Sequence, residues 1–291
     1  MHQRTVSLPV AAFRCARLIC HLAYGILLSI FYPHCSLSYR QRILRRWSTE
    51  LLDVLNVKLE RRGLPTPPSI QTTMLVSNHI SWLDVFVINA ITPACFVAKA
   101  EVNGWPLLGL LCRRTRTIFI ERDIRRDTVR SNGLISAMLD EGECVALFPE
   151  GTSTDGTGLR HFHSSLFQSA IDSDATLIPG TIHYHDGQGN RCDDAAFIGD
   201  MTFVESMKKI LFSRSLHASL TLLPAVQLTG KNRRTAATEA HSAIETTLHT
   251  PLPIPAASHP GNGIDKAARS VHAHSSYSLL LNSIFRPNKT P

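Results

Sequence analysis

The segment that decides the fold is MLVSNHISWLD, residues 74–84. It joins a short apolar run to a polar turn and then to an apolar stretch of helical length. An apolar run bounded by turn residues is typical of a buried strand. Ser81 and Asp84 have the spacing of a capping box, with Asp in place of the usual Glu, which marks the start of a helix. The segment therefore predicts a strand that turns directly into a helix, with His79 in the turn.

Short apolar runs alternate with segments of helical pattern on both sides of this segment. The candidate strands are residues 57–60, 73–76, 95–99, 117–120, 144–148, 176–178, 180–184 and 218–223. The candidate helices are residues 38–56, 83–90, 127–140, 165–172, 203–211 and 235–249. Strand–helix alternation predicts an α/β fold, with a mixed sheet flanked by helices.

Composition adds limits on the kind of protein. The chain has 291 residues, 44% of them hydrophobic, and a net charge of +7. It can bury a sizeable core, and its charge favours an anionic partner such as a membrane surface, a phosphorylated substrate, an acidic protein or nucleic acid. Aromatic residues make up only 7%, and no nucleic-acid-binding motif occurs, so we expect no nucleic-acid partner. The seven cysteines are scattered without a C-x-x-C pair, which favours a reducing compartment.

The N-terminal region predicts attachment to a membrane. Residues 18–32 are almost wholly apolar and are followed by Pro33. They are shorter than the roughly 20 residues of a full span, so an interfacial or re-entrant anchor and a buried helix both remain open. In the helix predicted at 38–56, Ser38 and Gln41 have capping-box spacing, four arginines crowd the first half, and Trp47 lies at the edge of the apolar stripe. Such a helix suits an anionic bilayer surface, and a solvated basic face on a core-packed helix is the alternative.

These patterns divide the chain into three parts. Residues 1–56 are predicted to be membrane-binding helices, and residues 57–249 an α/β catalytic domain. Residues 250–291 begin with four prolines within residues 251–260, followed by Gly-Asn-Gly, and are predicted to be a linker and tail.

His79 and Asp84 admit two interpretations. Ser81 and Asp84 can simply start a helix, which leaves His79 as a loop residue. Alternatively, the Asp84 carboxylate reaches back to the imidazole, fixes its tautomer and makes His79 an oriented general base. The second interpretation uses the position of His79 at the end of a strand, which faces the crevice in which α/β proteins usually bind ligands. The local pattern alone leaves both interpretations open and is typical of an ordinary helix start.

Three further motifs follow predicted strands. FPEGTS, residues 148–153, places Glu150 and Gly151 at the edge of the sheet. TIFIER, residues 117–122, ends on Arg122 amid an arginine-rich segment, and guanidinium groups bind phosphate through two parallel hydrogen bonds. LIPGT, residues 177–181, is an apolar strand broken by Pro-Gly, which could form a wall for the apolar part of a substrate.

In this order and spacing, H-x-x-x-x-D, F-I-x-R, F-P-E-G-T and I-P, with W-P-x-x-G at residues 105–109, resemble the glycerolipid (lysophospholipid) acyltransferase family. Within it, the bacterial 1-acylglycerol-3-phosphate acyltransferases are the most similar. The resemblance covers roughly residues 70–185. It implies that His79 deprotonates the free hydroxyl of the lipid and that Asp84 orients His79. It also implies that Glu150, Gly151 and Thr152 help bind the glycerol phosphate and that Arg122 holds its phosphate.

The implied reaction moves a fatty acyl group from acyl-CoA or acyl-carrier protein to lysophosphatidic acid, giving phosphatidic acid in phospholipid biosynthesis. No cofactor or metal is implied. The site would lie on the cytoplasmic side of the inner membrane, with membrane lipid as substrate and an anionic membrane surface as partner. A related acyltransferase acting on lyso-ornithine lipid or another lyso-lipid is the alternative, and an anionic-lipid-binding module without turnover is the non-enzyme alternative.

Two departures from the family pattern bear on the head group. Arg116 stands where the family often has Gly before F-I-x-R, and Ser153 stands where the family often has Arg after E-G-T. The missing arginine removes one potential phosphate ligand, for which Arg160 or a member of the arginine cluster at 113–116 could substitute.

Two other enzyme classes are disfavoured. GTSTD, residues 151–155, nearly matches the G-x-S-x-G of serine hydrolases but lacks the second Gly, so Ser153 is a weak candidate nucleophile. His161-x-His163 and His183-x-His185 lack the spacing of known zinc motifs, so we expect these histidines to be satisfied or exposed rather than metal ligands.

Overall fold

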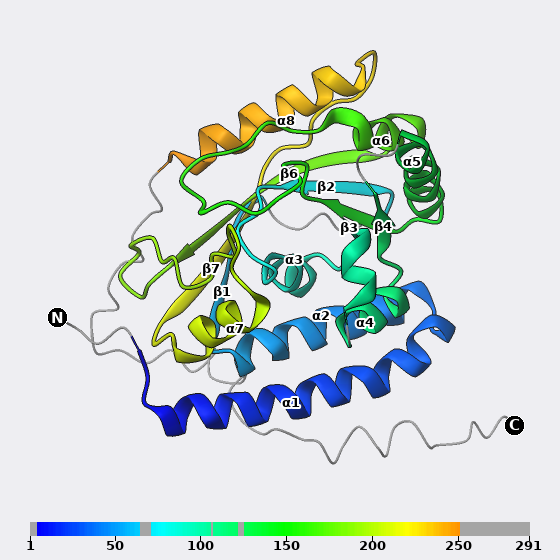
Figure 1. Ribbon diagram of the computed structural model, residues 1–291. Coiled ribbons are helices and arrows are strands. Elements are labelled where there is room, and N and C mark those ends of the chain that lie inside the picture. The colour runs from blue at the N-terminus through cyan, green and yellow to red at the C-terminus, as the bar shows by residue number, and fades with distance from the viewer. Residues whose placement is uncertain (1–4, 65–70, 106, 122–124, 251–291) are drawn as a thin grey trace, which may run out of the picture. The chain divides into compact units, whose positions relative to one another are not determined.

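The computed structural model describes residues 5–64, 71–105, 107–121 and 125–250 (Figure 1). Arg122 and the predicted linker and tail therefore lie outside the described residues. The described part belongs to one compact unit, Met1–Ile254. The division of the chain at residues 56 and 249 stays a prediction.

A seven-stranded sheet forms the centre of this unit. Its strands are β1 (Val57–Gly63), β2 (Thr73–Ser77), β3 (Cys95–Lys99), β4 (Ile118–Ile120), β5 (Cys144–Leu147), β6 (Thr176–His185) and β7 (Leu216–Leu222). They lie in the order β1-β7-β6-β2-β5-β3-β4. Only β6 and β7 among these neighbours are antiparallel, and the other pairs are parallel. The predicted α/β fold with a mixed sheet is confirmed.

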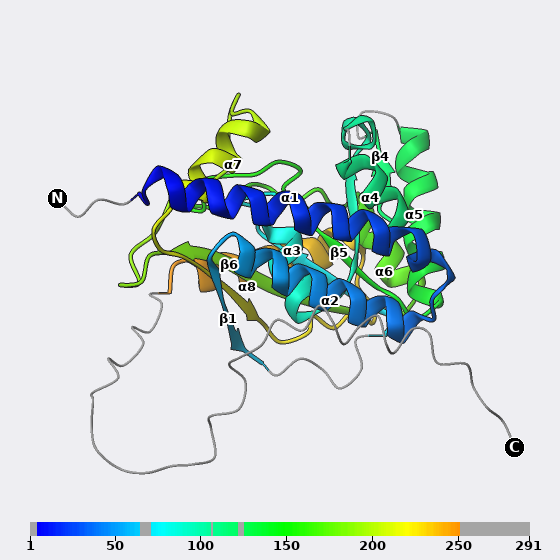
Figure 2. The same cartoon turned by 90° about the horizontal axis from the view of Figure 1, so that it is seen from below.

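Helices cover both faces of the sheet (Figures 1 and 2). They are α1 (Leu8–Phe31), α2 (Leu37–Val54), α3 (Asp84–Ile91), α4 (Leu108–Arg114), α5 (Arg125–Asp140), α6 (Gln168–Asp172), α7 (Phe203–Phe212) and α8 (Arg233–Leu248). Short 3₁₀ turns occupy Tyr32–His34, Ala100–Gly104 and Ser164–Phe167. One hydrophobic core packs α1, α2, α3 and α7 against one face of the sheet, and a second packs α5, α6 and α8 against the other.

The N-terminal helix begins ten residues earlier than the predicted segment 18–32. Arg14 interrupts the apolar pattern, but its guanidinium is buried and donates to the carbonyls of Leu211 (3.0 Å) and Ser213 (2.7 Å) at the end of α7. A charged group whose donors are satisfied in this way can lie within a packed helix. The segment Leu8–His34 has 27 residues and a mean hydropathy of 1.6 in its most apolar window, so it is long and apolar enough to cross a membrane.

The second helix differs from the prediction at its start. The helix begins at Leu37 after the N-cap Ser36, so the expected capping box at Ser38 and Gln41 does not mark its start. Trp47 packs inside, stacked on His21 with ring centroids 4.8 Å apart. Gly25 makes room for it, because a Cβ there would lie 2.7 Å from the indole nitrogen.

The large exposed apolar side chains gather on α1 rather than at the edge of α2. Leu8, Phe13, Ile19, Leu27 and Phe31 are each more than 60% exposed. Contiguous exposed apolar surface of this kind marks an interaction site for a protein or a membrane. The apolar stripe of α2, which includes Trp47, packs instead against α1 and α3.

The two strands predicted at 176–178 and 180–184 are one strand, β6. Pro179 cannot donate a backbone hydrogen bond, but its carbonyl accepts one from the Leu223 amide (2.9 Å). Pairing with β7 begins at the next residue, Gly180, which lies opposite Leu222. Pro179 therefore lies where β6 changes its pairing partner from β2 to β7, and the strand does not end there.

Candidate functional site

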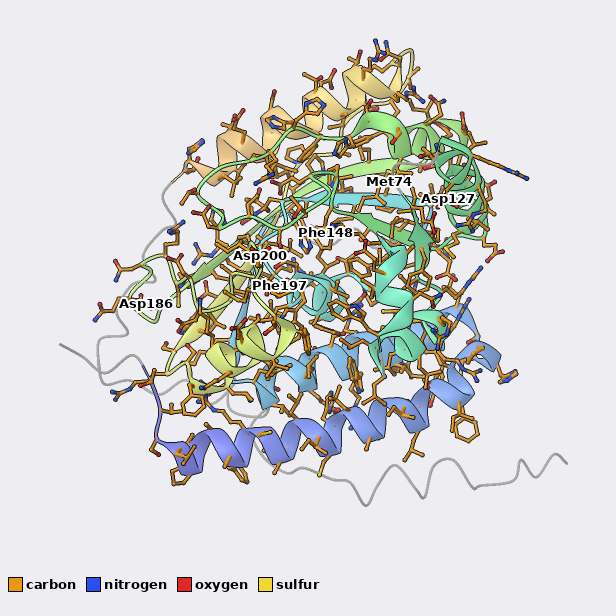
Figure 3. All side chains as sticks on the ribbon, viewed as in Figure 1. Met74, Asp127, Phe148, Asp186, Phe197 and Asp200 are labelled. Atoms are coloured by element: carbon orange, nitrogen blue, oxygen red, sulfur yellow. The ribbon has the colours of Figure 1, made fainter. Side chains whose placement is uncertain are left out.

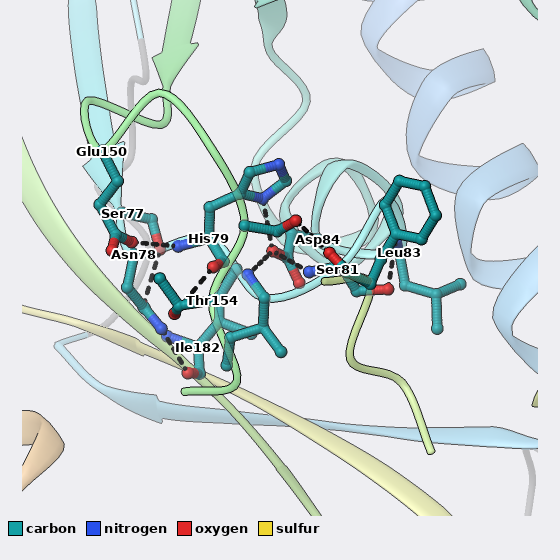
Figure 4. Close-up of polar contacts among 12 residues, drawn as sticks. Ser77, Asn78, His79, Ser81, Leu83, Asp84, Glu150, Thr154 and Ile182 are labelled. Atoms are coloured by element: carbon teal, nitrogen blue, oxygen red, sulfur yellow. Dashed lines mark hydrogen bonds and ion pairs between the residues drawn. The ribbon is translucent and has the colours of Figure 1, made fainter. Parts of the chain in front are cut away.

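Two polar turns meet at the carboxyl edge of the sheet. One follows β2 and carries His79; the other follows β5 and carries Glu150. β2 and β5 are adjacent and parallel, with Val76 opposite Leu147, so their turns lie side by side (Figure 4). The structure thus brings together the two motifs that the sequence places 71 residues apart.

The predicted contact between His79 and Asp84 is present. The imidazole Nδ1 lies 2.8 Å from Asp84 Oδ2. The same oxygen accepts from the backbone amides of Ile80 (2.7 Å) and Ser81 (2.9 Å). Since the carboxylate is an acceptor, the hydrogen bond places a proton on Nδ1 and leaves the lone pair of the neutral ring on Nε2.

Both interpretations of Asp84 that the sequence left open therefore apply at once. It is the first residue of α3, and its side chain orders the turn that precedes the helix. The capping box predicted at Ser81 is half formed: Ser81 Oγ accepts from the Leu83 amide (3.3 Å) rather than from the Asp84 amide. The same fully buried carboxylate also orients His79, so the local bonding of the turn and the orientation of the imidazole are one arrangement.

The other carboxylate oxygen of Asp84 is held by a residue that the sequence did not reveal. Tyr184, on β6, donates its hydroxyl to Asp84 Oδ1 at 2.8 Å. Burial and the neighbouring carboxylate raise the pKa of Tyr184 well above its usual value, so the phenol remains a donor. Tyr184 lies within the strand predicted at 180–184, but nothing in that pattern pairs it with a residue 100 positions away.

Asn78 also ties the turn that carries His79 to β6. Its side-chain amide donates to the Ile182 carbonyl (3.0 Å), and its side-chain oxygen accepts from the Ile182 amide (2.8 Å). A buried side chain that satisfies both groups of a strand residue fixes the position of the turn relative to that strand. The sequence offered one signal for this role of Asn78, namely an asparagine next to the histidine at the end of a strand.

The imidazole of His79 has one packed face and one open nitrogen. Its ring stacks on Phe148, with centroids 4.1 Å apart and planes 12° apart. The side chain keeps 21% of its surface exposed. Within the described part of the chain, Nε2 has no hydrogen-bond partner, whereas Nδ1 is held by Asp84. An oriented ring with an accessible Nε2 lone pair has the geometry of a general base.

Glu150 clamps the two loops. Its carboxylate accepts from the backbone amide of His79 (2.7 Å) with Oε1 and from that of Arg160 (2.9 Å) with Oε2. Burial raises the pKa of Glu150, and these hydrogen bonds from the backbone of Arg160 and His79 offset part of the effect. Both oxygens are thus engaged in ordering the backbone around the base.

The rest of the E-G-T motif lies closer to the surface. Gly151 has a φ of 78°, which favours glycine, and Thr152 is exposed. Thr154 donates its amide to the His79 carbonyl at 2.8 Å, so the loop closes over the turn of the histidine. Ser153 donates its hydroxyl to the Phe197 carbonyl, which gives the serine a structural partner and no activating base within the described residues.

Arg116 and Arg113 are occupied by other partners. Arg116 has a φ of 62°, which explains why the family often has Gly here, and it binds Glu143 (2.5 Å) and Glu141 (2.8 Å). Arg113 donates to Asn103. These two members of the cluster therefore do not face the site as free phosphate ligands. Arg122 lies outside the described residues, and its role stays a prediction.

Two cavities adjoin Phe148 and its neighbour Phe96. The larger, about 400 Å³, is apolar and lies among α1, α2, α3, α4 and α7. Its aromatic lining is Tyr32, Trp47, Trp82, Phe86, Phe96, Trp105 and Phe203. The smaller, about 250 Å³, is lined mainly by apolar residues, Phe148 among them, and carries three polar side chains, Thr128, His163 and Ser165. Phe96 stacks on Phe148 with centroids 5.9 Å apart, so the larger cavity reaches the wall on which the His79 ring rests. Figure 3 shows Phe148 in the interior of the described unit.

The expectation that the histidine pairs are satisfied or exposed holds for one nitrogen each of His183 and His185, which contact the carbonyls of Leu248 and Asp186, and fails for the other nitrogen. His183 Nδ1 and His185 Nε2 are both buried, and neither has a hydrogen-bond partner in the described ranges. Sequence spacing could not show this, because burial of these side chains depends on β7 and α8, which come later in the chain.

Comparisons with known proteins agree with this geometry. Residues 59–183 match the family model described as acyltransferase. A 1-acyl-sn-glycerol-3-phosphate acyltransferase of Neisseria meningitidis is 37% identical over 152 residues, 52% of this chain and 59% of that protein. A lyso-ornithine lipid O-acyltransferase of Pseudomonas aeruginosa is 33% identical over 211 residues, 72% of this chain and 79% of that protein.

A solved structure supports the fold. The crystal structure of the 1-acyl-sn-glycerophosphate acyltransferase of Thermotoga maritima has a TM-score of 0.57 and 14% identity, covering 81% of this chain and 96% of that chain. The Neisseria match extends over less than two thirds of the relative's own length. The Pseudomonas match, by contrast, extends over most of both chains.

Proposed function

Since this chain belongs to the acyltransferase family, we propose that it transfers a fatty acyl group from a thioester donor to the free hydroxyl of a lyso-lipid. The observation that carries the proposal is the His79 imidazole, held at Nδ1 by Asp84 at 2.8 Å and accessible at Nε2. One oriented base suffices for this reaction, because the substrate hydroxyl is itself the nucleophile.

In the proposed reaction, His79 Nε2 takes the proton of the hydroxyl as its oxygen attacks the thioester carbonyl. A carbon–oxygen bond forms, the carbon–sulfur bond breaks, and the leaving thiolate takes the proton back from the imidazolium. The products are an ester and a thiol. Asp84 holds the ring in place and stabilises the imidazolium. Tyr184, Asn78 and Glu150 act as positioning residues because they hold Asp84 and the turn.

The two cavities suggest where the two parts of the substrate bind. We assign the acyl chain to the apolar cavity of about 400 Å³, whose lining includes Trp82 from the catalytic turn. We assign the polar head to the side of the smaller cavity, which includes Ile120 at the end of β4. Arg122 follows that strand by two residues, which is consistent with its proposed phosphate contact. Thr152 and Gly151 are proposed to contact the glycerol phosphate from the facing loop.

Lysophosphatidic acid is the acceptor we favour, giving phosphatidic acid, on the ground of the 37% identity to the Neisseria protein. Lyso-ornithine lipid is the second candidate, because the Pseudomonas protein matches a larger share of this chain, 72%. Ser153, which stands where the family often has an arginine, also weakens the argument for a phosphate head. Acyl-CoA and acyl-carrier protein are the candidate donors.

The apolar helix α1 and the membrane-lipid relatives suggest membrane association. We propose that the catalytic domain lies on the cytoplasmic side of the inner membrane, where acyl-CoA and acyl-carrier protein are made. The exposed apolar face of α1 would then contact the bilayer, and the net charge of +7 would favour an anionic lipid surface.

A radiolabelled acyl-transfer assay with each acceptor and each donor tests the proposal. His79→Ala should abolish turnover on every acceptor while co-sedimentation with anionic vesicles persists. His249→Ala, at the exposed end of α8, is the matched control and should keep the wild-type rate. Transfer at an undiminished rate by His79→Ala would refute the mechanism, and vesicle binding by the wild type without any transfer would instead support a lipid-binding module.

A further inference from the structure

Three strands bring one carboxylate and two imidazoles together on the face of the sheet that points away from His79. The residues are Glu60 on β1, His185 on β6 and His217 on β7. His185 and His217 lie directly opposite each other in the antiparallel pair. Lys58 lies opposite His217, and Glu60 follows Lys58 by two residues, so its side chain is on the same face of the sheet.

The distances suit ligands that share one ion. Glu60 Oε1 accepts a hydrogen bond from His217 Nδ1 at 3.2 Å, whose place the ion would take, and lies 3.7 Å from His185 Nε2. One ligand atom from each of the three residues lies within 4.8 Å of the others. Around a tetrahedral zinc ion with bonds of 2.0–2.1 Å, two ligand atoms are about 3.4 Å apart. A small inward movement of the side chains would place all three on one ion.

His185 supplies a second, independent observation. Its side chain is 3% exposed, and Nε2 is buried without a hydrogen-bond partner among the residues that the structure describes. The 3.7 Å to Glu60 is too long for a hydrogen bond. Nδ1 lies 2.9 Å from the carbonyl of Asp186, in the loop that follows β6 (Figure 3), so the ring proton is on Nδ1. A backbone carbonyl that fixes the tautomer in this way is the usual support of a metal-binding histidine.

The Glu60 carboxylate is oriented so that one oxygen points toward the two imidazoles. Arg62 donates to Oε2 at 2.6 Å, which leaves Oε1 facing the two imidazoles. The ion pair with Arg62 fixes the orientation of the carboxylate, so that Oε1 can serve as the oxygen ligand.

We propose that Glu60, His185 and His217 form a binding site for one zinc ion. Two imidazoles and one carboxylate are ligand types that zinc prefers, and a fourth position stays open to a small ligand or water. The ion would join β1, β7 and β6. It would stabilise the sheet and would not take part in the reaction. Its influence on the site would pass through β6, because Tyr184, next to His185, holds Asp84 from the other face of this strand.

Metal binding by the full-length protein tests the site. Protein stripped with a chelator is dialysed against Zn²⁺, and the retained zinc is measured per chain. Wild type should retain about one ion, and a variant with both His185→Asn and His217→Asn should retain none. The matched control carries His161→Gln and His163→Gln, two histidines with the same spacing as His183 and His185, and should retain zinc as wild type does. Equal retention by wild type and the His185/His217 variant would overturn the proposal.

Cobalt substitution tests the wild type directly, so the result does not depend on a variant that folds. Co²⁺ bound by two imidazoles and a carboxylate gives visible ligand-field bands without the near-ultraviolet charge-transfer band of a thiolate. Zn²⁺ should also raise the thermal midpoint of wild type and leave that of Glu60→Gln nearly unchanged. Absence of Co²⁺ bands, or a thiolate band showing that cysteine binds the metal, would sink the assignment.

Discussion

The two faces of strand β6 differ in how their polar groups are satisfied. Toward His79, the Tyr184 hydroxyl is bonded to Asp84, and both backbone groups of Ile182 are bonded to Asn78. On the opposite face, Thr181 Oγ1, His183 Nδ1 and His185 Nε2 are buried with no partner in the part of the chain that is described. An unpaired buried polar group costs about 1–3 kcal/mol. The polar groups named on the first face are paired within the protein, whereas these three atoms on the second face are not.

The difference separates positioning from binding. A fully bonded network has one low-energy arrangement, so it can hold an imidazole ready for reaction before any substrate arrives. A row of unpaired buried groups has no such internal solution, and a bound ion or water relieves it. The bonded network on one face of β6 therefore holds the turn that carries His79 in a fixed position. On the other face, the unpaired Nε2 of His185 is available to the proposed zinc ion. Substitutions on the two faces should have opposite consequences.

Among substitutions in the groups that contact the two faces of β6, the largest effect is expected from Asp84→Asn, which keeps the shape of the bonded network and removes its charge. The amide oxygen can still accept from the turn, and the amide nitrogen can donate to the Tyr184 hydroxyl oxygen. The imidazolium of His79 loses its anionic partner, so turnover should fall by about 10²–10⁴-fold. Initial rates of acyl transfer measure this, and the thermal midpoint checks that the fold persists. A rate near that of wild type would show that the carboxylate only orders the turn.

A smaller effect is expected from Tyr184→Phe, which breaks one bond of the same network. Asp84 Oδ1 loses its donor and stays buried, so the free energy of unfolding should fall by about 1–3 kcal/mol. Turnover should fall less than in Asp84→Asn, because Oδ2 still holds His79.

The pH dependence distinguishes this positioning role. Because the pKa of Tyr184 is raised, the phenol donates throughout the range below the ordinary tyrosine pKa of about 10. The ratio of wild-type to Tyr184→Phe turnover should therefore stay constant from neutral to moderately alkaline pH. A ratio that collapses in this range would mean that the phenol titrates and is not a fixed donor.

The smallest effect is expected from Thr181→Val on the other face of the strand. Valine is nearly isosteric with threonine and removes a buried hydroxyl that has no partner within the described ranges. Unfolding in urea should show unchanged stability or a gain of up to about 1 kcal/mol. A loss as large as that of Tyr184→Phe would mean that both faces of β6 are equally well satisfied, and the contrast would fail.

Departures from the predicted elements have a common physical origin. The pattern of α1 fails at Arg14, whose charge is tolerated only because two carbonyls of a distant helix end accept from it. Trp47 belongs to the predicted apolar stripe, but whether it meets a bilayer or another helix is decided by Gly25 on α1, which leaves space for its indole. In each case the local sequence carries the residue, and a partner far along the chain decides where it points.

The site divides in the same way. The contact between His79 and Asp84 spans five residues and follows from a strand that turns into a helix, so the sequence alone predicts it. Glu150 was placed near it correctly because parallel strands end at one edge of the sheet. Its clamp on the His79 amide, by contrast, needs the actual register of β2 and β5.

The sequence by itself determined the alternation of strands and helices and the imidazole–carboxylate pair, because these depend on periodicity and on contacts within one turn of chain. The resemblance to the family came from the order and spacing of the motifs. Tertiary structure decided the Tyr184 contact to Asp84 and the meeting of Glu60, His185 and His217. Those residues come from strands that are neighbours only in the sheet. No local pattern encodes which side chains will oppose one another across strands so distant in sequence, because register is set by the packing of the whole sheet.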